Sequence, residues 1–234
     1  MSAGISAVSL GRRSVSVGAS SSLILIKHLN HTRLRNKELP LASQPAIQLD
    51  ALYSTLQTLT GKEKGARKFP PVESWSPEHC ADIGLEIRKD GSWWHEGTQF
   101  SRQKLVDLFS TILRKDDDGS TYLVTPYEKV IVHVEDAPFL GVRVDPAQKN
   151  GAPVIVVTTN LGESVELDAD HPLTVMTDPE TLEPSPYVRI RGRLDAKLTR
   201  SAFYELVSMA EEDGDQYVVR SNGQTFEIGP MSDV

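Results

Sequence analysis

The chain of 234 residues contains a single cysteine, Cys80, and this scarcity limits the chemistry that we expect of it. One cysteine excludes a disulfide framework within the chain and zinc sites built from several cysteines. The same usage is typical of proteins in a reducing compartment, so we predict a cytoplasmic protein. The apolar run at residues 23–26 is far shorter than the roughly 20 residues that a membrane helix needs, and we predict no membrane span.

Motifs that would identify an enzyme are also missing from the sequence. Neither common glycine-rich phosphate-binding loop is present, and there is no Gly-x-Ser-x-Gly sequence to present a nucleophilic serine. Cys80 and His171 each have acidic or histidine neighbours, but no second cluster completes a metal site around either of them. An enzyme of unknown class would be sought around these two residues, and the sequence identifies no cofactor.

Acidic residues are absent from the N-terminus and abundant elsewhere. Residues 1–37 contain six lysines and arginines and no acid, whereas residues 38–234 contain 19 basic and 32 acidic residues, a net charge of −13. Nucleic-acid polymers are bound through contacts of lysine and arginine with phosphates. We therefore expect no binding of nucleic-acid polymers to this acidic body.

The composition of residues 1–42 differs from that of the rest of the chain, and we interpret this segment as a disordered or spurious extension. Its serine-rich, basic and acid-free composition is also typical of a targeting segment, and the sequence leaves both interpretations open. Residues 43–71 are predicted to form a short amphipathic helix and a linker. Ser43 can cap the helix, whose apolar side carries Leu49, Leu52, Leu56 and Leu59.

Two amphipathic segments of similar pattern lie 98 residues apart, and they begin at Ser101-Arg102 and at Thr199-Arg200. The apolar residues that correspond at this offset are Leu105 with Phe203, Val106 with Tyr204, Leu108 with Leu206, Phe109 with Val207, and Ile112 with Ala210. We interpret the segments as helices of two copies of one strand–helix–strand unit, at residues 72–138 and 139–230. A groove between two such units is where a ligand would be expected.

The segments around these helices have the pattern of short strands. Ile83, Leu85 and Ile87 alternate with polar residues, and Asp90-Gly91 predicts a hairpin turn into residues 93–95. Further strands are predicted at residues 122–124, 130–134, 140–144, 154–159, 164–167, 173–177 and 187–191, with a last hairpin around residues 221–224. The regular strand–helix alternation of a parallel sheet is absent, so we predict an α+β fold with mainly antiparallel sheets.

A series of short motifs follows a definite order along residues 47–229. They are Cys80-Ala81-Asp82-Ile83, Asp90-Gly91-Ser92-Trp93, Ser101-Arg102, Leu108-Phe109-Ser110, Leu123-Val124-Thr125-Pro126, Glu128-Lys129-Val130, Asp136-Ala137-Pro138-Phe139, Thr159-Asn160, His171-Pro172-Leu173, Pro186-Tyr187-Val188 and Phe203-Tyr204. In this order they resemble the bacterial domain-of-unknown-function 1285 family. The resemblance implies a duplicated α+β fold whose C-terminal half is similar to a pleckstrin-homology-like barrel. It also implies a pocket between the halves for a nucleotide-like ligand and a role in signalling, and it implies no reaction.

Arg102 and Arg200 hold matching positions at the starts of the two predicted helices. A cation is unfavourable there, because the N-terminal end of a helix dipole is positive. The recurrence suggests an anion clamp, since arginine forms paired hydrogen bonds to phosphate or carboxylate. A salt bridge across the interface of the two units is the structural alternative, and the sequence leaves it open.

Arg189, Arg191 and Arg193 form a dense cationic cluster in the acidic body. Alternation along a strand places at least the first two on one face. That face would receive a phosphate-bearing ligand or would pair with the acidic loops.

Tyr187 and Trp94 offer flat faces for stacking a base, although aromatic residues in hairpins are usually part of the core. Glu128 and Lys129 follow the predicted turn at Thr125-Pro126 and would contact a ligand or form an ordinary ion pair.

We therefore expect a non-enzymatic protein that binds a small anionic, nucleotide-like ligand between the two units and acts in signalling. The candidate ligand-binding residues are Arg102, Glu128, Lys129, Asn160, Tyr187, Arg189, Arg191 and Arg200. The alternative is a protein–protein interaction module that holds a protein partner at its C-terminal sheet edge or N-terminal helix. An enzyme of unknown class is a third interpretation.

Overall fold

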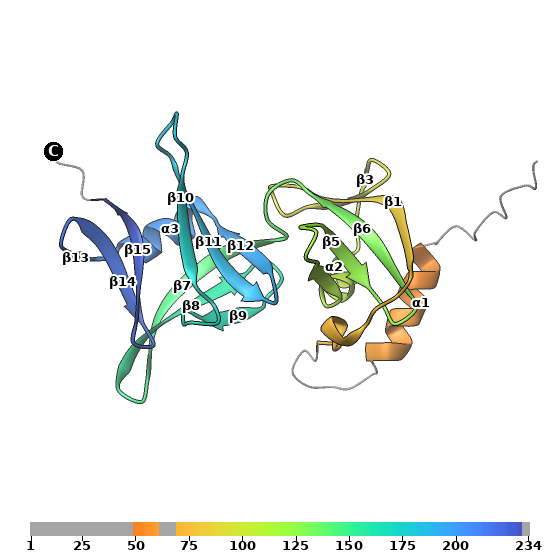
Figure 1. Ribbon diagram of the computed structural model, residues 1–234, viewed down its shortest axis with the longest axis horizontal. Coiled ribbons are helices and arrows are strands. Elements are labelled where there is room, and N and C mark those ends of the chain that lie inside the picture. The colour runs from red at the N-terminus through yellow and green to blue at the C-terminus, as the bar shows by residue number, and fades with distance from the viewer. Residues whose placement is uncertain (1–48, 61–68, 231–234) are drawn as a thin grey trace, which may run out of the picture. The chain divides into compact units, whose positions relative to one another are not determined.

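The computed structural model describes residues 49–60 and 69–230 of the chain (Figure 1). The predicted extension at residues 1–42, the predicted cap Ser43 and most of the predicted linker lie outside these residues. The helix α1 (Leu49–Thr60) confirms the predicted amphipathic helix, because Leu52 and Leu56 are fully buried on one side of it.

Sheet A contains the first six strands of the chain in the order β3-β2-β1-β6-β5-β4. All of its neighbouring strands are antiparallel except β1 and β6, which are parallel. The strands are β1 (His79–Ile87), β2 (Trp93–His95), β3 (Thr98–Gln99), β4 (Leu113–Lys115), β5 (Thr121–Val124) and β6 (Glu128–Val134). A short 3-10 helix, η1 (Val72–Ser74), precedes them.

Sheet B contains the next six strands in the order β10-β11-β12-β7-β8-β9. Here the one parallel pair is β7 with β12, and the other neighbours are antiparallel. The strands are β7 (Phe139–Lys149), β8 (Ala152–Thr159), β9 (Ser164–Glu166), β10 (Leu173–Thr177), β11 (Pro184–Arg191) and β12 (Leu194–Leu198).

The two sheets share one topology, which confirms the predicted duplication (Figure 1). Each sheet consists of two three-stranded meanders, and the first strand of the first meander pairs in parallel with the last strand of the second. The α+β prediction contains too much helix, because the fold is mostly β with few helices. The repeated unit is a six-stranded mixed sheet rather than a strand–helix–strand unit.

The two helices that suggested the repeat do not occupy equivalent places in it. The helix α2 (Gln103–Ser110) lies between β3 and β4, whereas α3 (Arg200–Val207) follows β12. Their buried sides correspond at an offset of 97 rather than 98: Phe109 corresponds to the fully buried Leu206, not to Val207, which is 41% exposed. Any amphipathic helix on a sheet shows this spacing, so the similarity follows from helix geometry rather than from the duplication.

The starts of these helices also differ from the prediction. Ser101 does not cap α2; the cap position is held by Arg102, whose side chain makes no capping hydrogen bond. In α3 the cap is Thr199, whose hydroxyl accepts a hydrogen bond from the Ala202 N–H at 3.4 Å. Arg102 therefore corresponds to Thr199, and Arg200 is the first residue of its helix, so the two arginines are not equivalent.

Strands β4 and β12 were not expected from the sequence, and β7 is longer than expected. β7 continues through Asp145-Pro146, beyond residue 144, where the predicted strand ends. Pro146 is tolerated because β7 pairs with β12 only as far as Gly141 and beyond that point has β8 as its one neighbour. A proline without an N–H fits such a one-sided strand.

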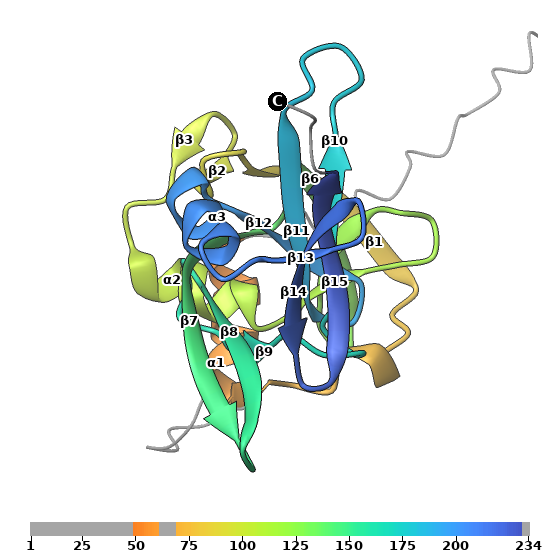
Figure 2. The same cartoon turned by 90° about the vertical axis from the view of Figure 1, so that its left-hand side faces the viewer.

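A small third sheet, sheet C, completes the chain. It contains β13 (Glu211–Asp213), β14 (Gln216–Ser221) and β15 (Gln224–Pro230), all antiparallel (Figure 2). The predicted last hairpin is confirmed, and its turn residues Asn222 and Gly223 have φ angles of 48° and 74°. These positive values are those of the tight hairpin turn for which Asn-Gly is favoured.

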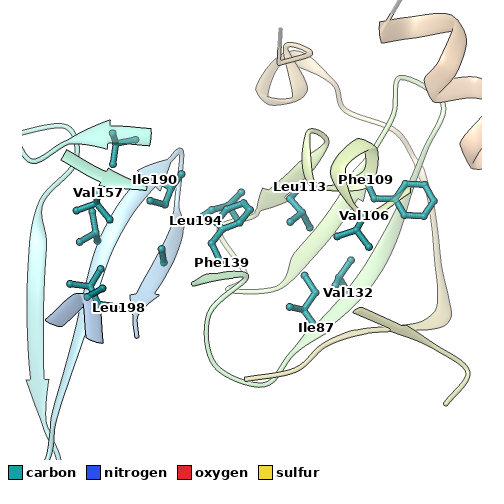
Figure 3. Packing of buried hydrophobic residues seen from close by; sticks show 14 of the residues in the cluster. Ile87, Val106, Phe109, Leu113, Val132, Phe139, Val157, Ile190, Leu194 and Leu198 are labelled. Carbon is teal, nitrogen blue, oxygen red and sulfur yellow. The ribbon is translucent and has the colours of Figure 1, made fainter. Parts of the chain in front are cut away.

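Buried side chains of sheets A and B form one hydrophobic cluster. Phe139 and Leu194 of sheet B lie next to Leu113 of sheet A, where β12 approaches β4 (Figure 3). The two similar sheets are therefore joined through apolar contacts. None of the described helices is long and apolar enough to cross a membrane.

Candidate ligand-binding site

A cavity of about 810 Å³ lies between sheet A and sheet B. Sheet A contributes residues of β4, β5 and β6 to its wall, and sheet B contributes residues of β10, β11 and β12. We call it the ligand cavity; its side chains include Lys115, Ile131, His133, Val134, Asp136, Pro138, Met176, Tyr187, Arg189, Arg193 and Asp195. The cavity is thus lined by both of the similar sheets.

Three basic side chains line the ligand cavity: Lys115, Arg189 and Arg193. Arg189 is held in place by Asp195, whose Oδ1 accepts from its Nε at 2.5 Å, and by the Gly192 carbonyl, which accepts from its Nη1 at 3.2 Å. Its Nη2 makes no hydrogen bond with the part of the chain that is described. Lys115 likewise makes no ion pair with residues 49–60 or 69–230.

Tyr187 is part of a hydrogen-bonded group at the cavity wall. Its hydroxyl donates to Asp136 Oδ1 at 2.8 Å, and Lys197 Nζ donates to Asp136 Oδ2 at 2.7 Å. Burial and the hydrogen bond to Asp136 raise the pKa of Tyr187, and the hydrogen bond to Asp136 raises the pKa of Lys197. Tyr187 therefore stays neutral and Lys197 stays charged across the physiological pH range.

His133 lies on the sheet A side of the cavity and pairs with Asp82 on the neighbouring strand β1, at 2.9 Å between Nε2 and Oδ2. Hydrogen bonds from the Gly84 N–H and then from His133 lower the pKa of Asp82. The carboxylate therefore stays ionised and orients the imidazole ring. A histidine oriented in this way can form a hydrogen bond with a ligand through Nδ1, but no nucleophile is paired with it among the described residues.

Arg191 does not line the ligand cavity, although the sequence placed it on one face with Arg189. Its guanidinium pairs with Glu163 and with the carbonyl oxygen of Ser110, and it lies over the ring of Phe139 at 5.1 Å. The pairing between β11 and β12 shifts register between Arg189 and Arg191. Arg189 and Arg191 are both half-buried on either side of the buried Ile190, so they share a face of β11 but have different surroundings.

Lys129 and Asn160 serve structural contacts, and the side chain of Glu128 has no partner among residues 49–60 and 69–230. Lys129 Nζ donates to Asp116 Oδ2 at 3.0 Å and lies 4.1 Å from the centre of the Tyr122 ring. Asn160 Oδ1 accepts the Leu140 N–H at 3.1 Å, which fixes the loop after β8.

The remaining predicted residues lie elsewhere on the surface. Arg102 borders a cavity of about 360 Å³ beside α1 and α2, together with Leu49 and Tyr53. Arg200 Nε donates to Tyr204 Oη at 2.9 Å within α3. The Trp94 indole N–H donates to Ser92, and Arg88 lies 3.6 Å above the Trp94 ring, so this face is already covered.

Of the eight predicted residues, the structure brings Tyr187 and Arg189 together in the ligand cavity. Sequence reasoning missed Lys115, Asp136 and Met176, and it named Arg193 in the cluster without selecting it. Asp136 lies in the Asp136-Ala137-Pro138 motif between the two sheets, and this position was the available signal. No signal in the sequence indicated Lys115, because β4 was not predicted. The described residues contain no group of three or more His, Cys, Asp or Glu side chains that could hold a metal ion.

Family models match two consecutive parts of the chain. Residues 70–137 match the domain of unknown function (DUF1285), N-terminal domain, and residues 138–228 match the protein of unknown function (DUF1285), C-terminal domain. The chain belongs to the DUF1285 family. The resemblance found in the sequence motifs is thereby confirmed, and the boundary between the two family domains falls immediately before β7.

Two solved DUF1285 structures are similar to this chain. A DUF1285 family protein from Silicibacter pomeroyi DSS-3 is 36% identical with a TM-score of 0.68, over 79% of this chain and 96% of that one. A DUF1285 family protein from Shewanella baltica OS155 is 31% identical with a TM-score of 0.43, over 54% of this chain and 91% of that one. A comparison with curated proteins finds no match.

Proposed function

We propose that this DUF1285 protein binds a small anionic ligand in the cavity between its two sheets. The observation that carries the proposal is the gathering of Lys115, Arg189 and Arg193 at one cavity of a chain whose net charge is −7. Ligand cavities typically measure 300–1,000 Å³, and about 810 Å³ falls within that range. An anion would therefore bind at this wall in preference to the rest of the acidic surface.

The wall also offers apolar and aromatic contacts to the body of a ligand. Ile131, Pro138 and Met176 line the cavity, and the Met176 side chain is 61% exposed. Tyr187 presents its ring on the same strand as Arg189. A flat, partly apolar body with an anionic group fits both features, and this supports the nucleotide-like class that the family resemblance implies.

Arg189 is prepared for anion binding by its present contacts. Asp195 and the Gly192 carbonyl hold Nε and Nη1, and Nη2 remains available to a ligand. A preoriented guanidinium loses less side-chain entropy on binding, and its hydrogen bonds to an anion are charge-assisted. Asp195 partly neutralises Arg189 and Asp117 partly neutralises Arg193, so Lys115, which makes no ion pair with the described residues, would supply most of the net positive charge.

We also propose a role in signalling and a pleckstrin-homology-like C-terminal half. The pleckstrin-homology-like character is supported by the order of elements, because the six strands of sheet B are followed by α3, which packs against β7 (Figure 2). A ligand that contacts both sheets would favour one arrangement of the two halves, which is what a sensory protein needs.

The test is thermal unfolding of the full chain with mono-, di- and cyclic nucleotides and with simple phosphates. A ligand at about 100 times its Kd stabilises the native state by roughly 2.7 kcal/mol, which raises the Tm by several degrees in a protein of this size. We expect a selective increase for one class of anion. An unchanged Tm across the whole panel would contradict the proposal.

The Arg189→Gln and Arg143→Gln variants form a matched pair for the same measurement. Arg143 pairs with Asp145 at 2.7 Å, much as Arg189 pairs with Asp195, but it does not line the ligand cavity. We expect Arg189→Gln to abolish the ligand-induced increase in Tm and Arg143→Gln to retain it. Equal effects of the two substitutions would mean that the anion binds elsewhere.

A protein–protein interaction module is the second candidate function. Three large side chains near the C-terminus support it: Tyr204 and Val207 of α3 are 57% and 41% exposed, and Tyr217 of β14 is 40% exposed. A flat ligand panel together with a stoichiometric partner that is lost on Tyr204→Ser would favour this function. A monomer that retains no partner would count against it.

A further inference from the structure

Two arginines near the end of β11 are two residues apart and differ in burial: Arg191 is the last residue of β11, and Arg193 lies in the turn that leads to β12. The side chains of Arg191 and its partner Glu163 are 19% and 12% exposed. Those of Arg193 and its partner Asp117 are 56% and 88% exposed. An exposed ion pair is screened by solvent and contributes little, so Arg193 can exchange its partner at low cost.

Arg193 lies at the boundary between two cavities. It lines the ligand cavity and also a neighbouring cavity of about 620 Å³, which we call the acidic cavity. Lys115 lines both cavities as well, whereas Asp117 lines only the acidic cavity. The present partner of Arg193 is therefore a carboxylate on the side of the boundary away from the proposed ligand.

We propose that Asp117 is an internal competitor for Arg193, and that an anion entering the ligand cavity displaces its carboxylate. The inference rests on the proposed function, since it requires an anion in that cavity. Arg193 then exchanges one negative partner for another, and the released Asp117 side chain turns into solvent, where it is already largely exposed. Arg189 stays with Asp195 during the exchange.

The exchange selects the chemical class of the ligand. A ligand carboxylate offers Arg193 the same group that Asp117 already provides, so it gains nothing from the replacement. A phosphoryl group carries a charge of about −1.5 to −2 near pH 7 and three acceptor oxygens, and it can bind Lys115 as well as Arg193. The site therefore favours phosphoryl-bearing ligands over carboxylates of similar size.

A titration with inorganic pyrophosphate tests the exchange by calorimetry on the full chain, using the wild type, Asp117→Asn, Arg193→Gln and the double variant. Because both side chains are exposed, we expect the variants to fold as the wild type does, and circular dichroism verifies this. We expect Asp117→Asn to tighten binding about two- to fivefold, the range of an exposed ion pair. We expect Arg193→Gln to weaken binding about tenfold or more, because a charge-assisted hydrogen bond is lost.

The double variant decides between exchange and a general charge effect. If Asp117 acts through Arg193, Asp117→Asn changes nothing in the Arg193→Gln background, whereas tightening that persists there overturns the exchange. Asp118→Asn removes the same charge one residue further along, from a carboxylate that accepts from Tyr122 and Ser120, and is expected to leave Kd unchanged.

Failure of the exchange is distinguishable from failure of the proposed function. Equal Kd values for the wild type and Asp117→Asn would overturn the exchange and leave the anion site standing. Absence of binding in all variants would overturn both. A malonate titration completes the test: binding as tight as that of pyrophosphate would contradict the selection of phosphoryl groups.

Discussion

The side chain of Arg191, on β11, donates a hydrogen bond to the carbonyl oxygen of Ser110, the last residue of α2. The final carbonyl groups of a helix have no partner within it, and the negative end of the helix dipole attracts a cation. Arg191 meets both requirements at once, and Glu163 balances its charge. This arginine of the second sheet therefore stabilises a helix that belongs to the first.

Replacing Arg191 should be more costly than replacing Arg193. Arg191→Gln leaves the carboxylate of Glu163, which is only 12% exposed, without its ion-pair partner, and we expect it to lower the free energy of unfolding by about 1–3 kcal/mol. Arg193→Gln removes an exposed pair and should cost less than about 1 kcal/mol. Urea unfolding of both variants measures the difference; equal losses would show that burial does not distinguish the two pairs.

Stability at acidic pH should depend on Asp116. Burial raises the pKa of this carboxyl, but hydrogen bonds from Arg114 and Lys129 outweigh burial, and the pKa lies below its usual value. A lowered pKa in the folded state means that the stabilisation is present above the unfolded pKa of about 4 and is lost as the pH falls through the folded pKa. We expect Asp116→Asn to cost about 1–3 kcal/mol at pH 7.

The pH dependence of that cost is the measurement. Urea unfolding of the wild type and Asp116→Asn between pH 7 and pH 2.5 should show the two stabilities converging below pH 4, because the wild-type carboxyl becomes neutral as well. A difference that stays constant down to pH 2.5 would contradict the role of the ionised carboxylate.

Gly141 has no room for a side chain. A Cβ at this position would lie 2.4 Å from Leu198 Cδ2 and 3.3 Å from Val157 Cγ1, because β7 pairs there with both β12 and β8. We expect Gly141→Ala to cost about 1–3 kcal/mol through overpacking. Gly229→Ala is the control, since no atom lies within 4 Å of its Cβ position.

A double variant identifies the cause of that loss. Leu198→Ala alone creates a cavity, but combined with Gly141→Ala it makes space for the new methyl group. The combined loss in unfolding free energy should therefore be smaller than the sum of the single losses. Strict additivity would show that Gly141 is required for its backbone rather than for close packing.

Ser221 connects sheet C to sheet B through two hydrogen bonds. Its buried hydroxyl accepts the Ile155 N–H at 2.9 Å and donates to the Leu167 carbonyl at 2.7 Å. Ser221→Ala would leave the Ile155 N–H without its partner, whereas the Leu167 carbonyl would still accept from Asn222 Nδ2 at 3.2 Å, and we expect a loss of about 1–3 kcal/mol. Ser208→Ala removes an exposed hydroxyl bonded to Glu205 and should change stability by less than about 0.5 kcal/mol in the same chemical denaturation.

Local patterns in the sequence were sufficient to predict most individual elements. The strand predicted at residues 187–191 is confirmed, and in it the buried Val188 and Ile190 alternate with arginines. The Asn222-Gly223 turn was found because its residues favour positive φ. β12 was missed although Leu194, Ala196 and Leu198 alternate as buried residues, because its start follows a tight turn at Gly192.

The pairing of distant strands could not be obtained in this way. β1 pairs with β6 and β7 with β12 across long stretches of chain, and no local signal specifies a parallel partner. The same limit applies to the site, where Lys115 meets Tyr187 and Arg189 only after both sheets have formed. Arg191 was predicted as a site residue, but in the folded chain its guanidinium pairs with Glu163 and the Ser110 carbonyl oxygen and does not line the cavity.

The parallel pairing of first and last strands imposes an order in time on folding. The central strand pair of sheet A, β1 with β6, cannot form until β6 has been synthesised. All strands of sheet A have been synthesised once the chain reaches Val134, before β7 begins at Phe139. Translation proceeds at roughly 5–20 residues per second and folding proceeds domain by domain, so we expect the first half to form on the ribosome while the second is still being made. The hydrogen bond between the Ser110 carbonyl and Arg191 can then form only after the second half has been synthesised, so the two halves join late in biosynthesis.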